Sequence, residues 1–365
     1  MGFDAFIGNP KGVAALRGML ASGRTPGALL FTGPEGVGKK TLALMLAKAL
    51  NCERCSDDFC GECPRCRQAE EMLVATREDL ARRRESKDTQ KRGEGLVYFD
   101  LQLIEPITRY ILMEQIRQLR SVAYTRPFEF PRRVFVINEA QAIHWQAIDL
   151  LLKVLEEPPE TTTLILICPN AYELRPTIRS RCRRVAFQPV EESVISALLA
   201  EEARVPKAQR ALAARVAAGS VAKAKTFDAG EFERRRQPWL DFLAAVSVKA
   251  REPLAADWRV LFDSTKALTE NRDQFEETLK MGYTLLRDVV QVALAGPEAK
   301  VVNVDLLSRL KTWAAKLGIR NIARLQEGLD QAYRLQTRNV NLQLGLEAVA
   351  LDVLGQPAGT LPPTE

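Results

Sequence analysis

Three groups of residues have types and spacings that could do chemistry, and the first is the glycine-rich segment GPEGVGKKT, residues 33–41. Gly33, Gly36 and Gly38 would let backbone amides turn toward phosphate oxygens. Lys39 stands where an ammonium group would reach the terminal phosphates. The segment therefore predicts a nucleotide-binding loop, with a simple packing turn as the alternative.

The residues that should hold a magnesium ion beside this loop are of the wrong type. Lys40 stands where a serine or threonine hydroxyl is required, and Thr41 comes one residue too late. Asn138 follows an apolar run and takes the place of an aspartate. Because magnesium requires hard oxygen ligands, we expect this chain to hold ATP and Mg²⁺ poorly and to hydrolyse ATP weakly or not at all. Glu139 would still be able to orient an attacking water.

The second group consists of cysteines, five of the chain's seven, at Cys52, Cys55, Cys60, Cys63 and Cys66. Closely spaced C-x-x-C pairs supply the thiolates of a tetrahedral structural zinc site. Unligated thiols and a redox pair are the alternatives, but five such residues in one polar loop exceed what either needs. Four ligands leave one cysteine over, and the spacing leaves open whether Cys52 or Cys55 completes the set.

The third group is the arginine-rich turn LRPTIRSRCRR, residues 174–184. Arg181 would project from the edge of the domain just before its last strand. A guanidinium at such a place can stabilise the γ-phosphate bound by a neighbouring subunit. The alternative is a basic surface turn without a catalytic role.

Short apolar, β-branched runs alternate with helical patterns in the first half of the chain, and these elements must position the three groups. The runs are residues 27–33, 98–106, 132–140, 161–170 and 183–189. Helices are expected at residues 39–50 and 145–159, the second with Ile148, Leu151, Leu152 and Leu155 on one face. Such alternation predicts a three-layer α/β domain with a parallel sheet.

Residues 70–96 are dense in charge, and we expect an exposed helix and loop inserted into this domain, with a DNA-contacting arm as the alternative. Strand signals end near residue 190. The sequence predicts an α/β domain at 1–187, an all-α lid at 188–235, an all-α collar at 236–356 and a disordered tail at 357–365.

Composition excludes several classes of protein. The chain has 365 residues, a net charge of +6 and one histidine, His144, so histidine-based catalysis is not expected. An apolar run of the roughly 18–20 residues needed to cross a bilayer does not occur, and the first residues are not those of a secretory signal. We therefore expect a cytoplasmic protein without a membrane partner.

Four motifs in order resemble the clamp-loader subunits of the bacterial DNA polymerase III holoenzyme, an AAA+ family, and most closely its delta-prime-like members. They are GPEGVGKKT, the cysteine loop after LAKALNC, LLLKVLEEPPETTTLILI at 150–167 and LRPTIRSRC. The resemblance continues through AAGSVAKA at 217–224 to NVNLQLGLEAVALDVL at 339–354.

The resemblance implies an AAA+ module and lid, and a collar that joins gamma/tau ATPase subunits and a delta subunit in a ring. It implies that Arg181 enters the ATP site of an adjacent subunit, and that the sliding clamp and primer–template DNA are partners through the complex. The family's zinc thiolates fall on Cys52, Cys60, Cys63 and Cys66, with Cys55 spare, although the gap from Cys52 to Cys60 departs from the usual spacing. The lid lacks a nucleotide-sensing arginine after Gly219 and Ser220.

The sequence thus predicts an accessory subunit of DNA polymerase III without ATPase activity of its own. It would act as a stator and supply Arg181 in trans while the sliding clamp is loaded. Two alternatives remain at this point: an autonomous AAA+ ATPase switch that uses Glu139, and a zinc-loop DNA-binding protein.

Overall fold

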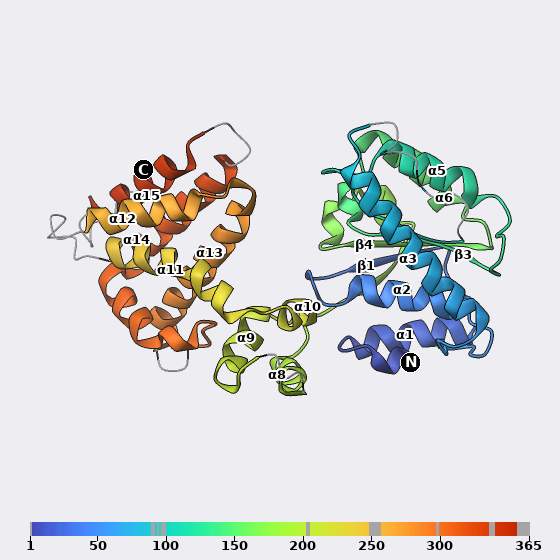
Figure 1. Ribbon diagram of the computed structural model, residues 1–365, viewed down its shortest axis with the longest axis horizontal. Coiled ribbons are helices and arrows are strands. Elements are labelled where there is room, and N and C mark those ends of the chain that lie inside the picture. The colour runs from blue at the N-terminus through green and yellow to red at the C-terminus, as the bar shows by residue number, and fades with distance from the viewer. Residues whose placement is uncertain are drawn as a thin grey trace. The chain divides into compact units, whose positions relative to one another are not determined.

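The computed structural model describes residues 2–88, 92, 95, 100–201, 205–247, 257–296, 299–335 and 340–355 (Figure 1). The chain divides into two compact units. The first comprises residues 1–195 and 218–225, and the second comprises residues 196–217 and 226–365. Among the described residues, no helix is both long and apolar enough to cross a membrane.

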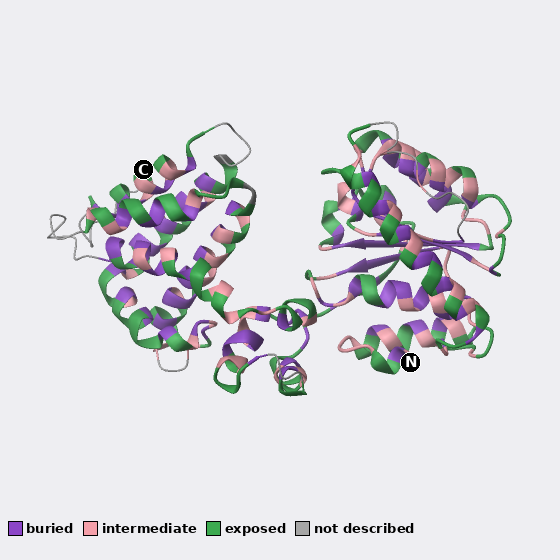
Figure 2. Ribbon diagram, in the orientation of Figure 1, coloured by how far each residue is buried: buried purple, intermediate pink, exposed green. Residues whose placement is uncertain are grey.

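A five-stranded parallel sheet forms the centre of the first unit, with the strand order β2-β3-β4-β1-β5. The strands are β1 (Ala28–Thr32), β2 (Leu101–Ile104), β3 (Arg133–Ile137), β4 (Thr162–Cys168) and β5 (Arg183–Ala186). Every residue of β1, β3 and β4 is buried, as expected for strands that are covered on both faces (Figure 2). The predicted parallel α/β sheet is confirmed.

Helices cover both faces of this sheet and complete three layers. Leu29 and Phe31 of β1 belong to one hydrophobic core, whereas Ala28 and Leu30 belong to the other, because successive side chains of a strand point to opposite faces. The first core is covered by α1 (Pro10–Ala21), α2 (Lys39–Ala49) and α3 (Pro64–Glu85). The second is covered by α5 (Met113–Ala123), α6 (Ile148–Glu156) and α7 (Pro176–Arg179).

Two expectations about helix faces need correction. The predicted buried face of α6 included Leu152, but this residue is only half-buried. Val154 is fully buried instead, because the buried face is centred on Leu151. The prediction that the helix after residue 70 is exposed is also wrong in part. Met72, Leu73 and Leu80 of α3 are buried in the first core, so α3 is a layer of the domain. Much of the predicted loop after it lies outside the described residues.

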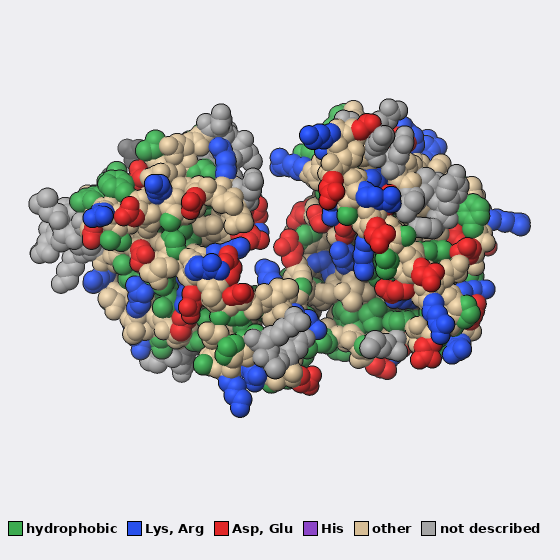
Figure 3. All heavy atoms as spheres, in the orientation of Figure 1, with side chains coloured by type: hydrophobic (Ala, Val, Ile, Leu, Met, Phe, Trp, Pro, Cys, Tyr) green, Lys and Arg blue, Asp and Glu red, His purple; other side chains and the backbone are tan. Residues whose placement is uncertain are grey.

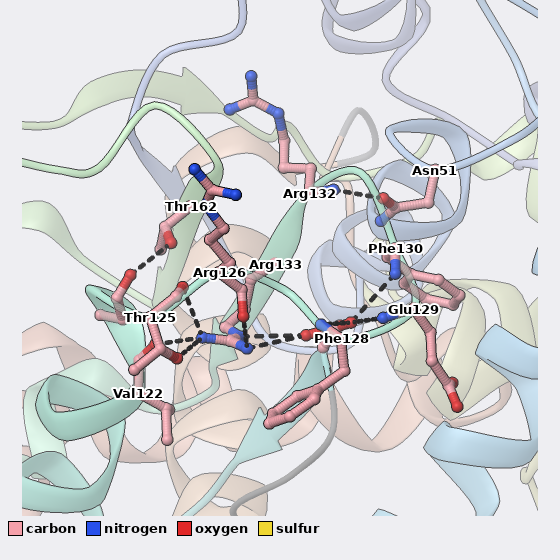
Figure 4. A network of polar contacts seen from close by, with 12 residues as sticks. Asn51, Val122, Thr125, Arg126, Phe128, Glu129, Phe130, Arg132, Arg133 and Thr162 are labelled. Atoms are coloured by element: carbon pink, nitrogen blue, oxygen red, sulfur yellow. Dashed lines mark hydrogen bonds and ion pairs between the residues drawn. The ribbon is translucent and has the colours of Figure 1, made fainter.

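A buried ion pair closes the loop between α5 and β3 (Figure 4). Asp100 Oδ1 accepts from Arg133 Nε and Nη2 at 3.2 and 3.0 Å, and both side chains are at most 1% exposed. Asp100 Oδ2 accepts the backbone N–H groups of residues 128–130 at 2.8, 2.8 and 3.1 Å. Arg133 also donates to the carbonyl oxygens of Thr125 and Arg126, at 3.2 Å each. One charge pair therefore fixes the backbone that leads into β3.

After Ala186 the described residues form helices and turns and no strand, which confirms the all-α expectation for this part of the chain. The helices are α8 (Glu192–Glu201), α9 (Arg210–Ala217), α10 (Val221–Lys225), α11 (Ala229–Val246), α12 (Trp258–Thr269), α13 (Phe275–Ala295), α14 (Leu307–Leu335) and α15 (Leu342–Leu354). Helix α10 belongs to the first unit. In the second unit Trp239, Phe275 and Leu346 lie in one hydrophobic core.

Short 3₁₀ helices complete the described chain: η1 (Phe3–Ala5), η2 (Ala140–Ala142), η3 (Trp145–Ala147), η4 (Ala171–Glu173), η5 (Lys207–Gln209), η7 (Arg272–Gln274) and η9 (Val304–Leu306). Helix α14 is kinked at Gly318. The φ angle of this residue is 68°, a backbone conformation that glycine adopts more readily than other residues. The division into a lid at 188–235 and a collar at 236–356 stays a prediction, and the expected tail at 357–365 lies outside the described residues.

Candidate nucleotide pocket and metal centre

The glycine loop lies between β1 and α2, in the strand, loop and helix order that the sequence predicts. Gly33, Gly36 and Gly38 have φ angles of 144°, 74° and 91°, which L side chains rarely adopt. A Cβ at Gly36 would lie 1.9 Å from Ser220 Oγ, and one at Gly38 would lie 2.7 Å from the Phe6 ring. Glycine is therefore required both by the turn and by the close approach of neighbouring elements.

Lys39 is the buried cation of this loop, with 8% of its surface exposed. Its ammonium donates to the carbonyl oxygens of Gly33 and Pro34, which carry no net charge. Burial lowers the pKa of Lys39 because the charged form has lost water. A phosphate group would supply the anionic partner that these carbonyls do not.

Glu105 accepts hydrogen bonds from both residues that stand at the expected magnesium-binding positions, Lys40 and Asn138. Lys40 Nζ and Asn138 Nδ2 both donate to Glu105 Oε1 at 3.0 Å. Arg84 Nη2 donates to the other oxygen, Oε2, at 3.1 Å. Burial favours the neutral carboxyl, but Lys40, Arg84 and Asn138 together hold the pKa of Glu105 below its ordinary value.

Magnesium does not fit this arrangement. The ion requires several oxygen ligands in an octahedral set. Here Lys40 and Asn138 direct hydrogens, not lone pairs, toward the carboxylate, and the only anionic oxygens of the group, those of Glu105, are already shared among three donors. Lys40 and Asn138, the side chains predicted to be unsuitable as metal ligands, therefore share one hydrogen-bond acceptor, Glu105.

Sequence reasoning missed both Glu105 and Arg84. Glu105 follows directly after β2, and β2 pairs with β3, which ends before Asn138. A polar residue at the carboxyl end of a parallel strand is a signal that could have identified Glu105. Arg84 lies near the end of α3 in a run of similar arginines and carries no distinguishing signal.

A cavity of about 1010 Å³ lies within the first unit; Lys39, Lys40 and Asn138 line it, whereas Glu105 and Arg84 are not among its lining residues. Seven of the eight residues predicted for the nucleotide site line it; Gly33 is the exception, and its carbonyl oxygen binds Lys39. Thr41 and Glu139 are exposed within the lining. Glu139 has a φ of 56°, an uncommon backbone conformation for a residue other than glycine. Apolar side chains, including Phe6, Ile7 and Val221, supply another part of the wall.

Four cysteine sulfurs converge beside this cavity. The sulfurs of Cys52, Cys60, Cys63 and Cys66 all lie within 4.8 Å of one another, and Cys55 lies outside this group. The Cys52 and Cys60 sulfurs are 3.8 Å apart, close to the roughly 3.8 Å edge of a tetrahedron with Zn–S bonds of about 2.3 Å. The four residues fit a tetrahedral metal ion.

Backbone amides support the sulfurs of this cluster. The N–H groups of Cys60, Cys63 and Cys66 donate to the sulfurs of Cys52, Cys60 and Cys63 at 3.5, 3.3 and 3.4 Å. Hydrogen bonds from the backbone of Glu62 and Cys63 lower the pKa of the Cys60 thiol to about 6. Burial raises the pKa of the Cys66 thiol. A cation would favour the thiolate form of all four.

The cysteine loop also holds the N-terminal segment. Asp58 accepts the backbone N–H of Phe3 at 2.9 Å and binds Arg17 at 2.8 Å. The Phe59 ring contacts the Phe3 ring edge to face, with centroids 5.9 Å apart. Because Ala5, Phe6 and Ile7 line the cavity, these contacts from Asp58 and Phe59 connect the cysteine loop to one of the cavity's walls.

Arg181 lies apart from the groups that line this cavity. It follows α7, and about a third of its side chain is exposed. Its Nη2 donates to Glu156 Oε1 at 2.7 Å, and its Nη1 donates to the carbonyl oxygen of Thr177 at 2.9 Å. The adjacent Cys182 is anchored in the interior, and burial raises the pKa of its thiol to about 12. The chain thus holds the guanidinium at its surface and does not bring it to its own glycine loop.

Comparison with known proteins assigns the chain to a family. The profile of the family described as "DNA polymerase III, delta subunit" matches residues 8–191, half of the chain. This chain belongs to the DNA polymerase III delta subunit family. Its resemblance to the clamp-loader subunits of that polymerase is therefore confirmed.

Relatives of this DNA polymerase III delta family member differ in how much of their length they share with it. DNA polymerase III subunit delta' of Bacillus subtilis is 25% identical over 346 residues, which are 94% of this chain and 95% of that protein. DNA polymerase III subunit tau of Escherichia coli is 32% identical over 226 residues, but these are only 31% of that protein. A gamma subunit-related protein of Thermotoga maritima aligns over 94% of this chain and 98% of its own, with 15% identity and a TM-score of 0.45. The chain spans nearly the whole delta' relative and about a third of the tau relative.

Proposed function

We propose that this delta-family chain is an ATP-hydrolysis-deficient subunit of a bacterial clamp loader that activates a neighbouring ATPase subunit in trans. One observation carries the proposal. Lys40 follows the glycine loop's Lys39 and Asn138 follows β3; both stand at expected metal-binding positions, and both donate to Glu105. A pocket arranged in this way lacks the means to hold the divalent ion on which phosphoryl transfer depends.

Without that ion, the charge that develops on a transferring phosphoryl group would be poorly stabilised. Glu139 alone would orient water without activating the phosphate. We therefore assign the chain no turnover of its own and regard it as an accessory subunit of DNA polymerase III.

Arg181 is the group through which the chain would act on a partner. Its guanidinium is held by Glu156 and by the carbonyl of Thr177, and it remains partly exposed. A γ-phosphate of an adjacent subunit would replace the Glu156 carboxylate as its anionic partner. A planar guanidinium supplied in this way accelerates hydrolysis by a factor of about 10³–10⁵.

The partners follow from the same proposal. Relatives of this chain are named as gamma, tau and delta' subunits of DNA polymerase III. We infer that gamma/tau subunits supply the ATP, that the collar at 236–356 joins them and a delta subunit, and that the sliding clamp and primer–template DNA are met through the complex. The cysteine cluster would hold structural zinc, and the assembly would work in the cytoplasm.

The test compares Arg181→Ala with Arg183→Ala, a matched control in which an exposed arginine two residues away is removed. Each variant is assembled with gamma/tau and delta subunits, clamp and primed DNA, and the ATPase rate of the complex is measured. Arg181→Ala should assemble normally and lower the rate at that site by about 10³-fold or more, whereas Arg183→Ala should not. Equal rates for both variants would refute the trans role.

A second candidate, an autonomous ATPase, is favoured by one feature: Glu139 lines the cavity in an unusual backbone conformation. Magnesium-dependent turnover by the isolated chain, abolished by Lys39→Ala, would establish it. The DNA-binding alternative has less support. Acidic and basic side chains are interspersed on the face shown in Figure 3, and α3, in which a DNA-contacting arm would begin, packs into the core.

A further inference from the structure

The Arg181 guanidinium, which the proposed function assigns to a neighbouring subunit's ATP, already has partners within this chain. Its Nη2 donates to Glu156 Oε1 at 2.7 Å. Its Nη1 donates to the carbonyl oxygen of Thr177 at 2.9 Å and to Ser180 Oγ at 3.5 Å. Of these three acceptors Glu156 carries the charge, and a charge-assisted hydrogen bond is stronger than a neutral one. Glu156 is therefore the group that a phosphate would have to displace.

The pairing with a carboxylate distinguishes Arg181 from the other arginines of the arginine-rich turn. The guanidinium of Arg179 lies 4.7 Å from the centre of the Tyr172 ring. Arg184 Nε donates to Thr32 Oγ1 at 3.0 Å. Within the part of the chain that the structure describes, none of the other arginines of this turn forms an ion pair. The carboxylate is therefore directed to the one arginine that carries the proposed trans role.

Glu156 is the last residue of α6, and the chain is anchored on both sides of it. Leu155, the residue before it, is 3% exposed. Pro158 packs so closely on Gly27 that a Cβ at Gly27 would lie 2.3 Å from the proline ring. A carboxylate gains nothing from the C-terminal end of a helix, where the backbone dipole is negative. The ion pair with Arg181 is therefore the contact that favours a carboxylate at this position.

We propose that Glu156 is a latch for Arg181, which holds the guanidinium until the γ-phosphate of a neighbouring subunit displaces the carboxylate. This inference rests on the proposed trans role of Arg181. The carboxylate oxygen lies 2.7 Å from Nη2, so it would repel a phosphate brought to the same nitrogen and has to turn away first. About half of the Glu156 side chain is exposed, so it can turn into water without disturbing the core.

The latch makes engagement of the arginine slower and more selective. Separating an exposed ion pair lowers the rate by up to about fivefold, which corresponds to about 1 kcal/mol. A terminal phosphate carries about two negative charges and can replace the single charge of Glu156, whereas a singly charged anion has no such advantage. Because salt screens exposed charges, the effect of the latch should decrease as the ionic strength rises.

The first measurement uses the isolated full-length chain and phenylglyoxal, a dicarbonyl reagent that modifies arginine side chains. Mass spectrometry of peptides follows the modification of Arg181 in the wild type, in Glu156→Gln and in the matched control Glu157→Gln, in which the adjacent exposed glutamate loses its charge. At low salt Arg181 should react about twofold to fivefold faster in Glu156→Gln and at the wild-type rate in Glu157→Gln. In about 1 M NaCl the difference should vanish, because the Debye length falls to about 3 Å. Arg183 should react equally in all three chains.

The second measurement is single-turnover ATP hydrolysis by the complex assembled with gamma/tau and delta subunits, clamp and primed DNA. The Arg181-dependent rate, which is the measured rate minus that of Arg181→Ala, should be about twofold to fivefold higher in Glu156→Gln and unchanged in Glu157→Gln. A residue that only positioned Arg181 would have the opposite effect, because its removal would lower this rate. Glu156 is half exposed, so its replacement should fold, and circular dichroism of each variant verifies this.

Two results would each overturn the latch: equal modification of Arg181 in the wild type and Glu156→Gln, or an Arg181-dependent rate in Glu156→Gln that is no higher than in the wild type. Failure of the trans role is distinct, because it appears as a wild-type rate of hydrolysis in Arg181→Ala; it overturns the role of the latch in hydrolysis as well. The modification assay contains no partner subunit, so it tests the pairing of Arg181 with Glu156 independently of the complex.

Discussion

Replacing Asp100 with alanine should destabilise the first unit strongly and leave the second unit unaffected. The carboxylate is fully buried and faces Arg133, which is itself 1% exposed (Figure 4). Without Asp100, a buried guanidinium keeps only neutral partners, including the carbonyl oxygens of Thr125 and Arg126. Three backbone N–H groups of residues 128–130 lose their acceptor at the same time.

Removing one partner of a buried ion pair costs about 3–5 kcal/mol, because the charge that remains is uncompensated. At about 1.36 kcal/mol for each factor of ten, amide hydrogens protected by global unfolding of this unit should exchange roughly 150-fold to 5000-fold faster. Asp100→Asn keeps the shape and one acceptor oxygen, so it should fall between the wild type and Asp100→Ala.

Hydrogen exchange read by mass spectrometry resolves the two units, which a single unfolding curve for a chain of two units does not. Peptides from β3 and β4 report on the first unit, and peptides from α13 report on the second. Arg117→Ala is the matched control, because the exposed pair of Arg117 with Glu114 should contribute at most about 1 kcal/mol. Acceleration of β3 and β4 by less than about tenfold, or equal acceleration of α13, would refute the reasoning.

Three further predictions concern the cysteine cluster and the pocket. Metal analysis should find one zinc per chain. The zinc should be lost in Cys60→Ser and retained in Cys55→Ser, because Cys60 belongs to the group of four sulfurs and Cys55 does not. Retention of zinc in both variants would contradict this ligand set. Lys40→Thr combined with Asn138→Asp should make nucleotide binding stronger in Mg²⁺ than in EDTA, since two oxygen ligands replace two donors that bind Glu105; equal binding in both conditions would show that another feature excludes the ion. The pKa of Glu105 lies below its ordinary value of 4.5 in the folded chain, so its contribution to stability is present above that value and is lost as the pH falls through the lower folded pKa. Hydrogen exchange in the first unit should therefore show less acid destabilisation in Glu105→Gln than in the wild type, and an unchanged acid profile would contradict the assignment.

The local features of this protein could be predicted from its sequence. The five strands, the glycine loop before α2 and the helical second half depend on apolar periodicity and on residue types within short windows, which a linear pattern records. The wrong residue types at Lys40 and Asn138 are likewise visible in the sequence, and so is the crowding of cysteines. The sequence therefore determined the fold class, the family and the unsuitable residue types at the two expected magnesium-binding positions.

Tertiary structure decided which distant groups meet. Glu105 joins Lys40, 65 residues earlier, and Asn138, 33 residues later, because the strand order places β2 beside β3 and α2 against the sheet. The folded loop likewise brings Cys52, and not Cys55, together with the sulfurs of Cys60, Cys63 and Cys66. It also turns the face of α3 that includes Met72 and Leu73 into the core, although its charge had indicated an exposed helix. Hydrogen bonds and packing across such separations depend on how the elements assemble in space, and the spacing of residues along the chain does not record that.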